Sequence, residues 1–120
     1  MNTILWALQG LLAALFGVSG ALKSTWSKSR LIASGQTGVA PFPLPLIRFT
    51  ACCELLGAAG MMLPRSLGVA EYLTPLAAAG FVVIMVAAIA SHVRLREPVN
   101  VAATSVILLV AATVAVARLG

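Results

Sequence analysis

The chain has 120 residues, of which 61% are hydrophobic and 9% are charged. A soluble domain carries charged side chains at roughly a quarter of its positions, so this composition excludes a water-facing surface and indicates a protein embedded in lipid. The net charge of +5 does not indicate nucleic-acid binding, because the basic residues lie between apolar segments and form no basic face with interleaved aromatic side chains.

Four apolar segments follow one another along the chain, each close to the ~20 residues that a helix needs to cross a bilayer. They are residues 4–22, 44–63, 73–90 and 99–117. Pro45, Pro75 and Pro98 lie at or within the first turn of the last three segments, where a missing N–H is harmless, and Pro64 is expected to end the second helix. Alternation of period two, the pattern of a membrane barrel, is absent. The sequence therefore predicts an all-α fold, a transmembrane four-helix bundle forming one membrane domain over residues 1–120.

Lysine and arginine are distributed unequally between the two sides of the predicted bundle. The first loop with the start of the second helix, together with the third loop, holds Lys23, Lys28, Arg30, Arg48, Arg94 and Arg96. The opposite side holds Arg65 and Arg118. Because basic loops stay in the cytoplasm, this bias predicts a multi-pass protein of the cell membrane with loops one and three cytoplasmic and both termini outside.

The first loop is long for a helical bundle and begins with the sequence KSTWSKSRLIASGQTG. Trp26, Leu31 and Ile32 lie among basic and hydroxyl residues there, a composition typical of a short amphipathic or re-entrant segment at the membrane interface. Two interpretations stay open. The segment is either a lid over a site between the helices or an anchor on the membrane surface.

Glu54 lies about halfway along the second apolar segment. A charged side chain at the membrane centre costs roughly 2.5–3.5 kcal/mol on insertion scales, so such a residue normally has a partner, a proton to carry or a ligand to hold. The nearest charge in the sequence is Arg48, but six residues of helix place it ~9 Å along the axis and ~120° around it. Arg48 is therefore a poor direct partner for Glu54, and its long side chain is expected to reach toward the headgroups.

Polar residues from all four helices converge on the half of the membrane that contains Glu54. We expect Glu54, His92 and Lys23 to act as catalytic groups. We expect ligand contacts from Arg48, Thr50, Ser19, Asn100 and Thr104. Structural interpretations compete for most of these positions, because a histidine or lysine at a helix end is often an interfacial residue, and a threonine often bonds back to its own helix. One histidine and one buried glutamate do not form a metal ligand set, and the sequence identifies no cofactor.

Cys52 and Cys53 are adjacent in the sequence. Neighbouring residues on a helix point about 100° apart, so these two thiols are poorly placed for a disulfide, and no CxxC redox pair is present. We interpret them as small apolar packing residues.

Three sequence elements together resemble the DoxX-like family of small membrane proteins. They are Gly17 to Lys23, with Lys23 ending the first helix, IRFTACCELLGAAGMMLP from Ile47 to Pro64, and AAIASHVRLRE from Ala87 to Glu97. The resemblance covers nearly the whole chain and implies a four-helix membrane bundle with Lys23, Glu54 and His92 as functional positions. Relatives that gave the family its name belong to a thiosulfate:quinone oxidoreductase, and others accompany thiol or oxidative-stress systems.

The sequence favours a membrane protein with an intramembrane pocket for a lipophilic small molecule, a quinone among the candidates. Acid–base or redox-linked chemistry would centre on Glu54 and His92, with isomerisation, epoxide opening or quinone protonation as candidate reactions. One alternative is a proton-coupled exporter like the small multidrug resistance proteins, although their glutamate lies in the first helix. Another is an accessory or assembly subunit of a membrane oxidoreductase complex. Besides the lipid bilayer, a second copy of the chain or another membrane protein is a possible partner.

Overall fold

The computed structural model describes residues 2–119, which are 86% helical and contain no strand. The long helices are α1 (Asn2–Thr25), α3 (Leu44–Leu67), α4 (Leu73–Arg94) and α5 (Pro98–Leu119). All four are long and apolar enough to cross a membrane, and each contains one of the apolar segments expected from the sequence. The first loop holds the short helix α2 (Lys28–Ala33) and the 3-10 turn η1 (Thr37–Val39). The predicted four-helix membrane bundle is confirmed.

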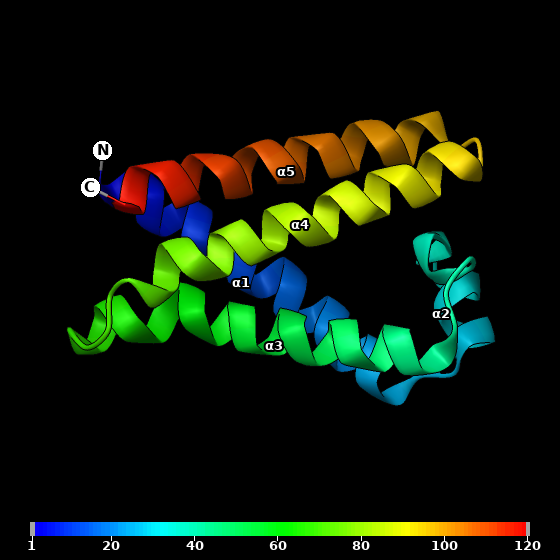
Figure 1. Cartoon of the computed structure of the whole chain (residues 1–120), viewed down its shortest axis with the longest axis horizontal. Coiled ribbons are helices and arrows are strands. Elements are labelled where there is room, and N and C mark those ends of the chain that lie inside the picture. Colours follow the sequence, from blue (N-terminus) through cyan, green and yellow to red (C-terminus); the bar gives the residue numbers. More distant parts are fainter. Residues whose placement is uncertain (1, 120) are drawn as a thin grey trace.

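The helices pack mainly as two pairs, α1 with α3 and α4 with α5, and α3 and α4 join the pairs. Figure 1 shows α3 and α4 close together near the turn that connects them and spread apart toward the opposite end, where α2 lies. We call the end with α2 the loop end. The start of α1 and the finish of α5 lie at the other end, which we call the terminal end.

A pair of stacked aromatic rings fixes the middle of the bundle. The rings of Phe16 from α1 and Phe81 from α4 lie 3.8 Å apart between centroids and are nearly parallel, at 8°. Phe81 also packs on Gly57 of α3 so closely that a Cβ added to this glycine would lie 2.4 Å from the ring. Three helices therefore meet at one aromatic contact, and α3 needs a glycine there.

The outer surface of the bundle is apolar, in contrast to that of a water-soluble protein. Large hydrophobic side chains on every long helix are more than half exposed, among them Val18, Leu56, Val83 and Val116. Such contiguous apolar exposure marks a surface that meets other apolar material, which for a multi-pass protein is the lipid. Hydrophobic side chains thus fill the core of the bundle and also cover the surface that faces the lipid.

Pro64 does not end α3. The helix continues through the proline to Leu67 and ends at Gly68, which adopts a left-handed conformation with φ of 67° and donates its N–H to the Pro64 carbonyl. The expectation that the second helix stops at Leu63 is thereby corrected. The helix is one turn longer because the backbone groups that the proline frees find partners elsewhere.

Side chains from two other helices bind the carbonyls near Pro64. Proline has no N–H for the Gly60 carbonyl four residues earlier, and Thr74 of α4 donates its hydroxyl to this carbonyl at 2.9 Å. Gln9 of α1 donates from Nε2 to the next carbonyl, that of Met61, at 2.6 Å. Neighbouring side chains commonly satisfy backbone groups freed by proline in membrane helices, which lets the helix continue.

The same glutamine connects this region to the end of α5. Arg118 donates from Nε to Gln9 Oε1 at 2.6 Å and from Nη1 to Asn2 Oδ1 at 2.8 Å, and its guanidinium lies 5.6 Å from the ring centroid of Trp6. Gln9 is fully buried and Arg118 is 9% exposed. Arg118, which the sequence presented as a topology-determining charge, therefore holds α5 against α1 at the terminal end.

We predict that the Thr74 hydroxyl matters only because of the proline. Thr74→Val should lower the free energy of unfolding by about 0.6–1.7 kcal/mol, the range for interhelical hydrogen bonds in membranes, because the Gly60 carbonyl loses its donor. In a Pro64→Ala background the restored backbone N–H supplies that donor, so the same substitution should cost much less. Denaturant unfolding in detergent micelles measures this double-mutant cycle. Thr113→Val, which removes a bond to the same helix, is the control, and equal costs of Thr74→Val in both backgrounds would contradict the interpretation.

Candidate functional site

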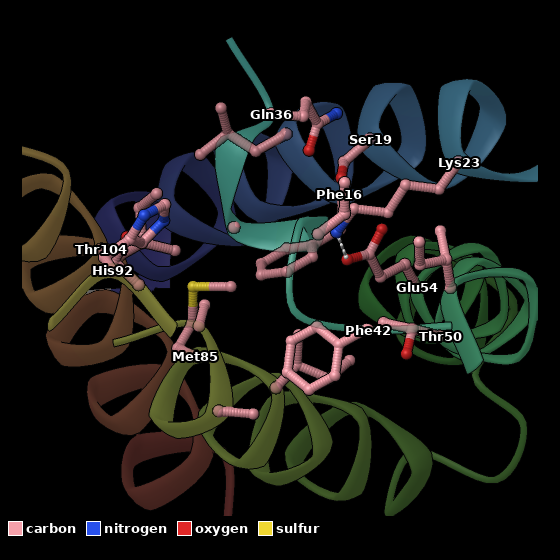
Figure 2. A pocket seen from close by; sticks show the side chains of 18 of the residues that line it. Phe16, Ser19, Lys23, Gln36, Phe42, Thr50, Glu54, Met85, His92 and Thr104 are labelled. Atoms are coloured by element: carbon pink, nitrogen blue, oxygen red, sulfur yellow. Dashed lines mark hydrogen bonds and ion pairs between the residues drawn. The ribbon is translucent and has the colours of Figure 1, made fainter. Parts of the chain in front are cut away.

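A cavity of about 560 Å³ lies at the loop end, where α3 and α4 diverge, and the four long helices and the first loop all contribute to its lining. It is lined by seven of the eight residues that the sequence singled out: Ser19, Lys23, Thr50, Glu54, His92, Asn100 and Thr104. The remaining wall is mainly apolar, with Phe16, Phe42 and Met85 among its side chains (Figure 2). Residues that are far apart in the sequence thus meet around one hollow.

Glu54 forms an ion pair with Lys23 at the cavity wall. Lys23 Nζ donates to Glu54 Oε1 at 2.8 Å, and the two side chains are 14% and 0% exposed. The second carboxylate oxygen, Oε2, is buried and has no hydrogen-bond partner among the described residues. Buried polar atoms are nearly always hydrogen-bonded, so an oxygen left free beside a cavity is the arrangement expected where a ligand supplies the bond.

Small residues bring the two charges together. A Cβ added to Gly20 of α1 would lie 3.0 Å from the Ala51 carbonyl oxygen and 2.9 Å from Leu55 Cγ, so α1 and α3 approach closely at this point. Small residues at a membrane-helix interface permit such an approach. Lys23 follows Gly20 by one turn, and Glu54 follows Ala51 by three residues, which places the ammonium and carboxylate on facing surfaces.

His92 lies across the cavity from Glu54, near Thr104 (Figure 2). Its Nδ1 is 2.9 Å from Glu97 Oε1. A carboxylate can only accept, so Nδ1 carries the proton of this hydrogen bond and Nε2 stays free for another contact. The sequence suggested His92 as a proton partner of Glu54, whereas the structure pairs Glu54 with Lys23 and His92 with Glu97.

Two further polar residues complete the surroundings of the imidazole. Thr37 of η1 donates its hydroxyl to Glu97 Oε1 at 2.9 Å, and Asn100 Nδ2 lies 3.4 Å from the Thr37 oxygen. We call Thr37, His92, Glu97 and Asn100 the histidine cluster. Sequence reasoning did not select Glu97 or Thr37. The signal that could have found Glu97 is its position five residues after His92, just beyond the end of the same helix.

The first loop covers the loop end of the cavity. Ser91 donates its hydroxyl to the Gly38 carbonyl at 2.7 Å, and the Gly38 backbone lies so close to His92 that an added Cβ would be 3.1 Å from the ring. Gly35, Gln36, Gly38, Val39 and Phe42 all line the cavity. Of the two interpretations of this segment, its position favours the lid.

Arg48 is not among the described residues that line the cavity. Its Nη1 donates to the backbone carbonyls of Lys23 and Trp26, at 2.5 and 2.9 Å. These carbonyls are at the end of α1, where helical partners are missing. Arg48 therefore fastens the start of the lid to α3, and its position gives no support to the expected ligand contact.

The two cysteines lie outside this cavity. Cys52 is exposed on the outer surface, Cys53 is half-buried, and both are free thiols. Cys53 lines a separate groove between α3 and α4.

Four helices of membrane-spanning length around a buried ion pair define a small multi-pass membrane protein. The model of the DoxX-like family matches residues 7–114, a range that includes every residue lining the cavity. The chain belongs to the DoxX-like family. No curated protein and no solved structure matches it.

We predict that Lys23 and Glu54 depend on each other for stability. Lys23→Met should lower the free energy of unfolding by about 3–5 kcal/mol at neutral pH, because it leaves a buried carboxylate without its cation. Lys23→Met combined with Glu54→Gln should recover most of that loss. Unfolding in detergent micelles measures both, with Arg94→Met, at an exposed cation of the same end, as the control. A double variant no more stable than Lys23→Met would contradict the pairing.

The histidine cluster predicts an acid-sensitive contribution to stability. Hydrogen bonds from His92 and then Thr37 hold the pKa of Glu97, in the turn between α4 and α5, below its ordinary value of 4.5. A carboxyl with a lowered folded-state pKa contributes stability above the unfolded-state value and loses it as the pH falls through the folded-state value. Glu97→Gln should therefore be less stable than wild type above about pH 4.5, and the difference should shrink as the pH falls through the lowered pKa of Glu97.

Melting temperatures of the two proteins across this pH range test the prediction. Glu71→Gln, at an exposed carboxyl of the terminal end, serves as the control and should change little. A wild-type advantage that persists unchanged through the acidic range would show that the Glu97 charge is not responsible.

Proposed function

We propose that this DoxX-like protein binds a lipophilic small molecule in the cavity at the loop end and performs acid–base chemistry on its polar group. The observation that carries the proposal is the unpartnered Oε2 of a fully buried Glu54 beside a mainly apolar hollow. Small-molecule sites typically combine apolar walls with a few placed polar groups, in a volume of about 300–1,000 Å³. The cavity volume of about 560 Å³ lies within that range.

The ion pair suits proton transfer at the ligand. A ligand hydroxyl facing Glu54 would donate to Oε2, and the carboxylate can accept that proton as the O–H bond breaks. The Lys23 ammonium, 2.8 Å from the other carboxylate oxygen, remains positive and would stabilise the ligand oxyanion. In a site shielded from water such a charge acts more strongly than it does in solution.

The opposite wall offers a second polar contact. The hydrogen bond to Glu97 engages Nδ1 of His92, which leaves Nε2 free to contact a ligand. A molecule with oxygen functions at opposite ends of a ring, such as a quinol or quinone, would meet Glu54 at one end and the histidine cluster at the other. This two-sided arrangement supports the quinone-like class among the candidate ligands.

The ion pair weighs against the proton-coupled exporter. An exporter of cations needs a carboxylate whose charge the substrate and the proton neutralise in turn. Here Lys23 already neutralises Glu54 from within the same chain.

We predict that the wild-type protein, purified from membranes, carries a lipophilic small molecule that Glu54→Gln loses. Removing a hydrogen bond to a charged group costs about 1.5–3 kcal/mol, so the ligand content should fall at least about tenfold. Organic extraction followed by mass spectrometry measures the content per protein. Thr113→Val should retain the ligand, and a helical circular-dichroism spectrum with a cooperative thermal transition would show that Glu54→Gln is folded. Identical extracts from wild type and a folded Glu54→Gln variant would refute the proposal.

A further inference from the structure

A second hollow adjoins the cavity on the outer face of the bundle. It is a groove of about 900 Å³ between α3 and α4. Phe49 and Thr50 of α3, and Val83 and Ile84 of α4, line both the groove and the cavity. The two hollows therefore meet at these four side chains, in the region where α3 and α4 begin to diverge.

The groove differs from the cavity in its chemistry. Among the described residues that line it, Thr50 and Cys53 are the polar ones, and no charged side chain contributes. The lining extends along α3 from Phe49 to Pro64, which at 1.5 Å per residue is ~22 Å. This length exceeds half of the ~30 Å hydrocarbon core of a bilayer. The groove thus offers a long apolar track from the cavity toward the terminal end.

Small residues keep the track open. Gly57, Gly60, Ala77 and Gly80 all line the groove. Gly57 and Gly60 are close to the neighbouring helix, but a Cβ added to Gly80 would meet no heavy atom of the described residues within 4 Å. Gly80 is therefore a position where a side chain can be added to the groove without a clash inside the protein.

We infer that the cavity and the groove together hold one amphiphilic lipid, with its oxygen-bearing head at Glu54 and its long acyl or isoprenoid tail in the groove between α3 and α4. This inference rests on the proposed function and narrows its ligand class. A short, compact molecule would need only the cavity. The observation that extends the site to a tail is that the two hollows adjoin and share the lining residues Phe49, Thr50, Val83 and Ile84.

The groove needs only to provide space for the tail, because binding the tail contributes little free energy. Lipid chains are as apolar as the groove, so moving a tail between them gains little free energy. A cavity of about 560 Å³ encloses a drug-sized molecule, and a head bound at Glu54 with a long chain needs an opening in the bundle wall. Filling the groove should exclude long-chain ligands by steric overlap while leaving short-chain ligands in the cavity unaffected.

Two photoreactive alcohols test this inference. One is hexadecanol with a diazirine near the end of its chain, and the other is hexanol with a diazirine. Both are applied to the detergent-purified protein, and the labelled residues are located by mass spectrometry. The hexadecanol probe should label α3 and α4 along the groove, the hexanol probe should label the cavity, and Glu54→Gln should reduce both several-fold.

Gly80→Leu supplies the steric test and Gly10→Leu its matched control, because an added Cβ at Gly10 of α1 also meets open space. Gly80→Leu should reduce groove labelling by the hexadecanol probe several-fold and leave hexanol labelling unchanged. Gly10→Leu should change neither. Loss of hexadecanol labelling in the Gly80 variant alone would support the shared lipid site.

The outcomes separate this inference from the proposed function. If both probes label Glu54→Gln as strongly as wild type, the proposed function is overturned, and the inference with it. Glu54-dependent labelling that Gly80→Leu leaves unchanged would overturn the tail position alone. If a diazirine phospholipid labels the groove equally in wild type and Glu54→Gln, the groove holds ordinary bilayer lipid. If no probe labels the groove and a second copy of the chain can be cross-linked there, the groove is a protein interface. Each of these results would overturn the inference.

Discussion

The ion pair between Lys23 and Glu54 is the constraint around which the loop end of the bundle is arranged. A buried pair gains little net stability over apolar residues of similar volume, because desolvation of both charges offsets their attraction. Stability alone therefore does not explain why α3 carries a carboxylate at membrane depth. Glu54 uses one carboxylate oxygen for Lys23 and leaves Oε2 without a partner among the described residues. The arrangement holds the charge in place and leaves one carboxylate oxygen free for the ligand proposed above.

The terminal end shows what a structural polar cluster looks like in the same bundle. Gln9 uses both ends of its amide, donating to the Met61 carbonyl and accepting from Arg118, and Thr74 binds the carbonyl that Pro64 leaves free. These bonds let α3 continue past its proline. They hold α1 and α4 against α3, and α5 against α1. The detected cavity with a charged wall lies at the other end, where α3 and α4 spread apart. The terminal end also leaves one buried atom without a partner among the described residues, Arg118 Nη2. The loop end differs because its unpartnered atom, Glu54 Oε2, belongs to a residue that lines a cavity.

Composition and segment length were sufficient to predict the fold, because a chain with so few charges has no alternative to crossing the bilayer. Most of the polar side chains that line the cavity were also predictable, since Lys23, His92 and Thr104 lie near the ends of spans that meet at the same membrane depth as Glu54. Which of these side chains bond to one another could not be predicted from the sequence. In the sequence, Glu97 has the position of an ordinary loop charge. In the structure, the turn after α4 brings its carboxylate to His92. The continuation of α3 past Pro64 depends on a threonine of another helix, and local sequence rules do not include such a partner.

The way the lid is fastened bears on how a ligand reaches the cavity. On one side, Arg48 binds the carbonyls at the end of α1, where the lid begins. On the other side, Ser91 binds the Gly38 carbonyl, and Thr37 binds Glu97 in the turn between α4 and α5. A segment held at both sides by buried and half-buried hydrogen bonds must break several of them to open. Where the cavity meets the outer groove, the wall between α3 and α4 has the apolar side chains of Phe49, Val83 and Ile84, whose rotation breaks no hydrogen bond. The fourth side chain, Thr50, donates its hydroxyl to the Leu46 carbonyl of its own helix. For the lipophilic ligand proposed above, the least obstructed route from the bilayer to Glu54 would therefore pass through this wall and avoid water.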